Sequence, residues 1–235
     1  GVARPPHSYA PPGGLFNRAG PLAAAMAVVL VAALLACAAR AGQHETRILV
    51  LGDSLTAGYG LAAAAAFPSR LEAGLRALGH VVRVINGGVS GDTSAGGRSR
   101  LDWALDDRPH IAIVELGAND GLRGLDPAMT VANLDAIIVR LKAARVGVLL
   151  TGMVAPPNLG RDYETQFNAV FSALARKHDV AFYPFFLDGV AMRPELNQAD
   201  GLHPNAKGVA VIVDRITPYV VRLLKTSRSD TPWTP

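Results

Sequence analysis

The chain has 235 residues, half of them hydrophobic, with one cysteine and a formal net charge of +4. This length suits one domain with a substantial core, and a lone Cys37 excludes an internal disulfide framework and a cysteine-based zinc site. The basic balance does not indicate nucleic-acid binding. Three arginines precede the first acidic residue, Glu45, and no basic cluster that would track a phosphate backbone follows it.

Two unusual segments precede the first predicted strand. Residues 5–14 are rich in proline and glycine, and we expect them to be disordered. Residues 22–39 form an unbroken apolar run behind Arg18, which is typical of a secretory signal peptide or of a membrane anchor whose N-terminus stays inside. A buried helix is disfavoured because the run has no polar face.

Three fates of this apolar run stay open. Cleavage at a small-residue site, residues 36–38 or 39–41, would release the protein, whereas retention of the run would leave a single membrane anchor. Leu-Leu-Ala-Cys at residues 34–37 resembles a bacterial lipobox, in which Cys37 would carry the lipid. Each fate predicts export, so we expect the rest of the chain to be periplasmic, secreted or anchored to the envelope of a bacterium.

The folded domain is predicted to span residues 43–226, after a leader of residues 1–42 and before a loose tail of residues 227–235. Within it, apolar runs typical of strands alternate with segments of helical spacing. The strand-like runs are residues 48–51, 81–85, 111–116, 146–150 and 180–183. The helical stripes are Phe67, Leu71, Leu75 and Leu78; Leu134, Ile137, Ile138 and Leu141; Phe167, Val170, Phe171 and Leu174; and Val209, Ile212, Val213 and Ile216. Fully apolar strands separated by helices predict an α/β fold, a three-layer sandwich with a central parallel sheet.

Ligands of such sheets bind at the carboxyl ends of the strands, and polar residues gather at these positions. Gly-Asp-Ser-Leu at residues 52–55 follows the first predicted strand, a glycine-rich stretch at 86–94 follows the second, and the third runs into residues 115–120. Asp-Gly-Leu-His-Pro at residues 200–204 stands just before the last predicted helix. We therefore expect four polar blocks to meet at one edge of the sheet.

These blocks contain the groups that ester hydrolysis by a serine requires. The reaction needs a nucleophile, a base, a carboxylate that orients the base, and fixed donors for the oxyanion. Ser54 supplies a hydroxyl, His203 an imidazole and Asp200 a carboxylate three residues earlier. The backbone N–H of Gly91 and the side-chain amide of Asn119 are candidate oxyanion donors. Each of these residues taken alone is more often a turn or surface residue, so the prediction depends on the set.

Neighbouring polar residues have structural interpretations. Asp53 is expected to stabilise the turn after the first strand, and Asp92 to be a local cap or turn acceptor. His80, His110 and His178 precede predicted strands and are expected at the opposite edge of the sheet, away from the four blocks.

The order of the blocks resembles the SGNH/GDSL hydrolase family. The blocks are GDSL at 52–55, SGDTS at 90–94, GAND at 117–120 and DGLHP at 200–204. The resemblance covers residues 47–224. The stretches ELGANDGLRG at 115–124 and FPSRLEAGL at 67–75 are especially similar to the bacterial periplasmic branch of acyl-thioesterases, lysophospholipases and arylesterases.

The resemblance implies a flavodoxin-like sandwich and a serine esterase that hydrolyses acyl esters or thioesters, with no cofactor and no metal. It implies Ser54, Asp200 and His203 as the catalytic triad. It implies the N–H of Ser54, Gly91 and Asn119 as the oxyanion hole. The implied substrate is a small acyl ester or thioester, with a lysophospholipid among the candidates, and membrane attachment would run through residues 22–39 or a lipidated Cys37.

The sequence leaves two alternative functions open and disfavours two others. A carbohydrate O-acetyl esterase uses the same chemistry and stays open, as does a catalytically idle module that binds acylated ligands, although the complete set of five residues argues against idleness. A flavin-binding electron carrier is disfavoured because residues 86–97 match no nucleotide-binding pattern. An ordinary α/β-hydrolase is disfavoured because the chain has no Gly-x-Ser-x-Gly elbow.

Overall fold

The structure, a computed structural model, describes residues 45–227. The predicted leader, the apolar run at 22–39, Cys37 and residues 228–235 lie outside the described residues. Within residues 45–227, no helix combines the length and the apolar character that crossing a bilayer requires.

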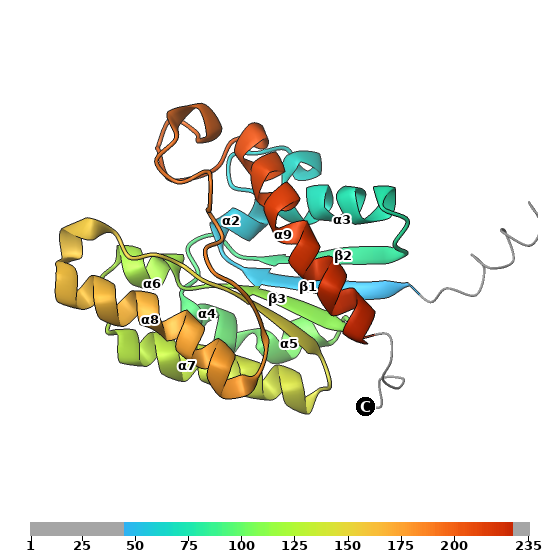
Figure 1. Ribbon diagram of the computed structural model, residues 1–235, viewed down its shortest axis with the longest axis horizontal. Helices are drawn as coiled ribbons and strands as arrows, with labels where there is room; N and C mark the ends of the chain where they lie inside the picture. The colour runs from blue at the N-terminus through green and yellow to red at the C-terminus, as the bar shows by residue number, and fades with distance from the viewer. Residues whose placement is uncertain (1–44, 228–235) are drawn as a thin grey trace, which may run out of the picture. The chain divides into compact units, whose positions relative to one another are not determined.

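Five parallel strands form the central sheet, in the order β2-β1-β3-β4-β5 (Figure 1). They are β1 Thr46–Gly52, β2 Val82–Gly88, β3 Ile111–Glu115, β4 Gly147–Thr151 and β5 Ala181–Tyr183. Each coincides with one of the five predicted apolar runs to within a few residues. The central strands β1 and β3 are buried almost throughout, as expected for parallel strands that are covered on both faces.

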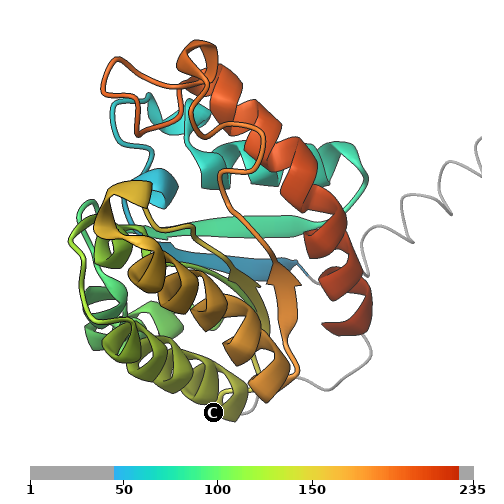
Figure 2. The same ribbon diagram turned by 60° about the vertical axis from the view of Figure 1, so that its left-hand side comes forward.

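Helices cover both faces of the sheet, which confirms the predicted three-layer α/β sandwich (Figures 1 and 2). The helices and 3-10 turns are α2 Ser54–Ala57, η1 Ala63–Ala65, α3 Phe67–Ala77, α4 Ser94–Ser99, α5 Leu101–Leu105, α6 Ala118–Leu122, α7 Pro127–Ala143, η2 Pro157–Leu159, α8 Arg161–His178, η3 Pro194–Leu196 and α9 Ala206–Ser227. Helices α3 and α9 pack together on one face. Helices α7 and α8 pack together on the other face, where α4 and α5 also lie.

The apolar stripes predicted from helical spacing lie against the sheet, with one exception. All stripe residues of α7, α8 and α9 are buried, and so are Phe67, Leu71 and Leu75 of α3. Leu78, the last residue assigned to the first stripe, is 62% exposed. Helix α3 ends at Ala77, so Leu78 no longer follows the helical rotation that turns the other three residues inward.

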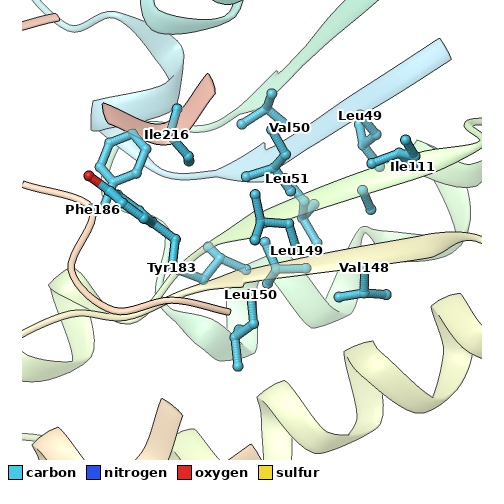
Figure 3. Close-up of a cluster of buried hydrophobic side chains, with 14 of the residues drawn as sticks. Leu49, Val50, Leu51, Ile111, Val148, Leu149, Leu150, Tyr183, Phe186 and Ile216 are labelled. Atoms are coloured by element: carbon cyan, nitrogen blue, oxygen red, sulfur yellow. The ribbon is translucent and has the colours of Figure 1, made fainter. Parts of the chain in front are cut away.

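The core contacts the sheet on both sides of its central strands. Figure 3 shows a cluster of buried side chains that contains residues of β1, β3 and β4 together with Tyr183, Phe186 and Ile216. Phe186 also meets Phe67 edge to face, with ring centroids 5.0 Å apart, a geometry that favours aromatic pairs beyond their burial. This packing fixes the sheet, and therefore the edge from which the polar blocks emerge.

Candidate active site

The carboxyl edge of the sheet gathers the predicted site residues. Strands β1, β2 and β3 end level with one another, because Gly52 pairs with Gly88 on one side and with Glu115 on the other. The segments that leave these three ends carry the candidate nucleophile and both candidate oxyanion donors. The loop between η3 and α9 carries Asp200 and His203. Four segments far apart in the chain therefore meet at one edge.

The turn after β1 presents Ser54 as the first residue of the short helix α2. Gly52 has no room for a side chain, since a Cβ there would lie 2.1 Å from Oγ1 of Thr56. Asp53 caps the helix, because its Oδ1 accepts a hydrogen bond of 2.9 Å from the N–H of Leu55. This confirms the prediction that Asp53 stabilises the turn, and it explains why a small residue and an acid precede the serine.

A serine, an imidazole and a carboxylate are hydrogen-bonded in series at this edge. Nε2 of His203 lies 2.9 Å from Oγ of Ser54, and Nδ1 of His203 lies 2.7 Å from Oδ2 of Asp200. The imidazole is thus positioned to take the hydroxyl proton with one nitrogen while the carboxylate holds the other.

The loop itself keeps Asp200 charged. Its Oδ1 accepts the backbone N–H groups of Leu202 at 2.9 Å and His203 at 3.0 Å. The backbone hydrogen bond from His203 contributes most to lowering the pKa of Asp200 to about 2, followed by the backbone bond from Leu202 and the bond to the imidazole. Asp200 is therefore a carboxylate at neutral pH, the form that stabilises an imidazolium.

The candidate donor Gly91 lies in a turn that is tied to the end of β1. The N–H of Val89 donates to the carbonyl of Gly52 at 3.1 Å, and the guanidinium of Arg123 donates to the carbonyl of Gly91 at 2.9 Å. Gly91 has a φ of 84°, a backbone conformation that favours glycine. The turn thus has a conformational reason for glycine at this position.

Asn119 stands at the start of α6, and both hydrogens of its amide already have acceptors. Nδ2 donates to Oδ2 of Asp53 at 3.1 Å and to the carbonyl of Asp92 at 2.9 Å. These bonds link the serine turn, the Gly91 turn and α6. They also mean that donation to an oxyanion requires one N–H of Asn119 to be shared with, or released from, its present acceptor.

The side chain of Asp92 does not act as a local cap, so that prediction is wrong. Oδ2 of Asp92 accepts from Nε of Arg100 at 2.6 Å, in an ion pair that is mostly shielded from solvent. The guanidinium of Arg100 also donates to the carbonyl of Gly52 at 2.8 Å. The cap of α4 is Thr93 instead. Arg100 carries no sequence signal of this contact, since the pairing depends on how α4 folds back.

Glu115, the last residue of β3, has a buried carboxyl group that contacts the turn carrying Ser54. Its Oε2 accepts from Oγ1 of Thr56 at 2.7 Å and from the N–H of Asp53 at 3.3 Å. Burial raises the pKa of Glu115 well above its ordinary value, and the nearby Asp53 charge adds to this. Burial likewise raises the pKa of Asp53 to about 6. An acid inside an otherwise apolar strand was the available signal for this pair.

The pKa of Asp53 predicts a pH dependence of stability. The unfolded chain releases the Asp53 proton near pH 3.8 and the folded chain near pH 6, so the contribution of this group to the free energy of unfolding should fall as pH rises through that window. We expect the difference in unfolding free energy between wild type and Asp53→Asn to fall by about 2 kcal/mol between pH 4 and pH 6. Urea titrations at a series of pH values measure it, and a pH-independent difference would contradict the raised pKa.

Within residues 45–227, the histidines outside the candidate site lie just before strands, as predicted. His110 accepts the N–H of Arg47 through Nδ1 at 2.9 Å, and His178 pairs with Asp135. Their edge is opposite to that of Ser54. Within residues 45–227, no three histidine, cysteine or acidic side chains cluster as ligands of a metal ion would.

A parallel sandwich with a serine–imidazole–carboxylate series at its carboxyl edge is typical of serine hydrolases. The profile of the GDSL-like lipase/acylhydrolase family matches residues 50–211. The chain belongs to this family, and it is an enzyme that hydrolyses ester bonds.

Individual proteins agree with this assignment. The chain is 39% identical over 189 residues to an arylesterase of Vibrio mimicus, covering 80% of this chain and 94% of that protein. It is 41% identical over 176 residues to thioesterase 1/protease 1/lysophospholipase L1 of Escherichia coli, covering 74% and 83%. The crystal structure of AlinE4, an SGNH-hydrolase family esterase, superposes with a TM-score of 0.66 at 46% identity, covering 77% of this chain and 98% of that one.

Proposed function

We propose that the protein is a serine esterase and thioesterase in which Ser54 is acylated, His203 is the base and Asp200 orients it. The observation that carries this proposal is the series of hydrogen bonds from Ser54 through His203 to Asp200. As Oγ of Ser54 attacks the acyl carbonyl, its proton passes to Nε2 of His203. The imidazolium that forms is stabilised by the Asp200 carboxylate.

The attack turns the carbonyl oxygen into an oxyanion. The N–H groups of Ser54 and Gly91 and the amide of Asn119 are the proposed donors to it. His203 returns the proton to the leaving alcohol or thiol, which departs and leaves an acyl-Ser54. Water deprotonated by His203 then attacks the acyl group, and collapse of the second oxyanion releases the carboxylic acid and restores Ser54.

The surroundings of the site favour an acyl substrate over a polar one. Four large apolar side chains that lie within five residues of a site residue in the sequence are strongly exposed, and each offers apolar surface to a ligand. They are Val89 at 44%, Leu122 at 50%, Leu202 at 53% and Tyr59 at 54%. An acetylated sugar presents hydroxyls to such groups, whereas the acyl chain of an aryl ester, thioester or lysophospholipid presents methylenes. The arylesterase and lysophospholipase names of the relatives agree with this choice.

A hydrolysis panel on the full chain tests the proposed substrates. It contains p-nitrophenyl and acyl-CoA esters from acetyl to palmitoyl, a lysophosphatidylcholine and an acetylated xylan. We expect turnover of aryl esters and acyl-CoA, with kcat/KM higher for chains longer than acetyl, because added methylenes bind apolar surface. Turnover confined to the acetylated polysaccharide would favour the carbohydrate esterase instead.

We also propose that the protein is exported to the periplasm or attached to the envelope. The support for this proposal is the apolar run at 22–39 behind Arg18. Mass spectrometry of the N-terminus of the protein purified from cells tests it. A diacylglyceryl group on Cys37 indicates the lipobox, a new N-terminus after residue 38 or 41 indicates simple secretion, and an intact leader in the soluble fraction would contradict export.

The proposed oxyanion hole predicts a large kinetic effect of Asn119→Ala. An amide that donates to the transition state more strongly than to the substrate raises kcat, and loss of one such donor costs about 100- to 1000-fold. We expect kcat to fall by this amount with KM little changed. The melting temperature should also fall, because both hydrogen bonds to Asp53 and Asp92 are lost.

Controls separate these two effects. Asn158→Ala alters an exposed asparagine in η2 and should leave kcat and melting temperature unchanged. Asn119→Asp should be at least as inactive as the alanine variant, since it brings a carboxylate toward Asp53 and the developing oxyanion. Near-normal kcat in folded Asn119→Ala would remove Asn119 from the oxyanion hole and leave it a purely structural link.

A further inference from the structure

The base and the nucleophile belong to segments that meet only through the fold. Ser54 lies in the turn after β1, and His203 lies 149 residues later, in the loop before α9. The three residues directly before His203, which are Asp200, Gly201 and Leu202, are exposed, and a Cβ on Gly201 would have no neighbour within 4 Å. Packing alone therefore gives this loop little support, and something else must hold the imidazole at hydrogen-bonding distance from the serine.

Gln198 links the loop to the serine segment. Its Nε2 donates to the carbonyl of Tyr59 at 2.8 Å and to the carbonyl of Pro204 at 3.0 Å. Its backbone N–H donates to the carbonyl of His203 at 2.7 Å. Gln198 thus binds the carbonyls of two consecutive residues, His203 and Pro204, and also the carbonyl of Tyr59 in the neighbouring segment.

Tyr59, whose carbonyl accepts from the side chain of Gln198, belongs to the turn that carries Ser54. The N–H of Tyr59 donates to the carbonyl of Ser54 at 3.1 Å, so the Tyr59 backbone is fixed to that of the serine. The ring of Tyr59 also packs on the ring of His203, with centroids 4.6 Å apart. A Cβ on the next residue, Gly60, would lie 2.2 Å from Oε1 of Gln198, which shows how closely the amide sits against this turn.

Among the described residues, two hydrogen bonds join residues 53–62 to residues 197–205. One is the Ser54–His203 bond itself, and the other is the bond from the side chain of Gln198 to the backbone carbonyl of Tyr59. We infer that Gln198 is a positioning residue, which holds the His203 loop against the Ser54 turn and so keeps Nε2 of His203 in place to accept the Ser54 proton. This inference rests on the proposed function, because it assigns Gln198 a task only if His203 is the base.

The chemistry of the amide sets the expected effect of substitution. Gln198→Ala removes both side-chain bonds and leaves the backbone bond to His203. Displacement of a catalytic group by about 1 Å costs on the order of 100-fold in rate, so we expect kcat to fall by about 10- to 100-fold with KM changed less than about threefold. Gln198→Glu should be at least as poor, because an ionised carboxylate donates no hydrogen bond and would face two carbonyl oxygens.

Two control variants separate positioning from stability. Gln166→Ala changes an exposed glutamine on α8 and should be neutral. Asn205→Ala lies in the same loop as His203, and its side-chain amide donates only to the carbonyls of Glu195 and Asn197. It should lower the melting temperature while keeping kcat within about threefold of wild type, because it leaves the bond between Gln198 and Tyr59 intact.

The experiment measures kcat, KM, melting temperature and the second-order rate of Ser54 labelling by a fluorophosphonate in the full chain of each variant. Labelling requires the Ser54–His203 pair but no substrate fit, so we expect its rate in Gln198→Ala to fall in parallel with kcat. Unchanged kcat and labelling in folded Gln198→Ala would overturn the inference. Equal losses of kcat in Gln198→Ala and Asn205→Ala would also overturn it, since loop stability would then account for both.

A Ser54→Ala variant in the same series distinguishes failure of the inference from failure of the proposed function. If Ser54→Ala is inactive and Gln198→Ala is normal, the triad stands and Gln198 has no positioning task. If Ser54→Ala stays active, the proposed nucleophile is wrong, and the inference about Gln198 falls with it.

Discussion

Ser54→Ala is expected to lower kcat by about 10⁵- to 10⁶-fold, as removal of the nucleophile does in other triad enzymes. Without Oγ, neither the proton transfer to His203 nor the acyl-Ser54 intermediate can occur, and only hydrolysis assisted by the oxyanion donors remains. The side chain of Ser54 makes its hydrogen bond to the imidazole and is only partly buried. The free energy of unfolding should therefore change by no more than about 1 kcal/mol.

Covalent labelling provides the direct measurement. A fluorophosphonate should modify the wild-type chain once, on the peptide that contains Ser54, and abolish esterase activity in proportion to labelling. Ser54→Ala should not be labelled. Ser69→Ala, which alters an exposed serine of α3, should be labelled and active like the wild type. Stoichiometric labelling at another residue together with full inhibition would refute the assignment of the nucleophile.

The fold was predictable because its signals are local and repeated. Each strand is a short apolar run, and each major helix carries an apolar stripe at helical spacing, so a parallel sandwich follows from alternation alone. The one stripe residue that failed, Leu78, stands at a helix end, where hydrogen bonding in the last turn and not the stripe decides the boundary.

The placement of the candidate nucleophile and oxyanion donors was predictable from the sequence, and that of the side chains that support them was less so. Ser54, Gly91 and Asn119 follow strands that lie side by side, so parallel topology is enough to place them at one edge. The partners of Arg100 and Gln198 depend on how α4 and the loop before α9 fold back over that edge. Their long polar side chains reach backbone carbonyls there, and no spacing in the sequence encodes such contacts.

The contacts of Asp53 and Asn119 in the folded chain could not be predicted from the sequence. The sequence identifies Asp53 as a turn residue, but only the folded chain places it above Glu115 and beside the amide of Asn119. The amide of Asn119, a candidate oxyanion donor, therefore already makes two hydrogen bonds. The Asp53 carboxylate and the carbonyl of Asp92 hold its amide nitrogen in place between the serine turn and the Gly91 turn, so they orient the donor and also compete for it.

The second large effect is expected for Asp200→Asn, which should lower kcat by about 10⁴-fold. The asparagine oxygen can still accept the N–H groups of Leu202 and His203, so the loop keeps its shape. The asparagine NH₂ would instead face Nδ1 of His203 and donate to it. Nδ1 then becomes an acceptor and the remaining proton sits on Nε2, the nitrogen that must take the proton of Ser54. The variant should fold and be labelled by a fluorophosphonate only slowly.

A stability measurement on the same variant checks the carboxylate independently of turnover. Because the folded-state pKa of Asp200 is lowered to about 2, the wild type should gain stability from this group above pH 4 and lose it as pH falls from about 4 to 2. Asp200→Asn should lack that pH-dependent gain, while Asp162→Asn, an exposed change in the first turn of α8, should leave turnover unaltered. A kcat within tenfold of wild type in folded Asp200→Asn would exclude Asp200 as the group that orients His203, because an amide at that position cannot enforce the tautomer that the reaction needs.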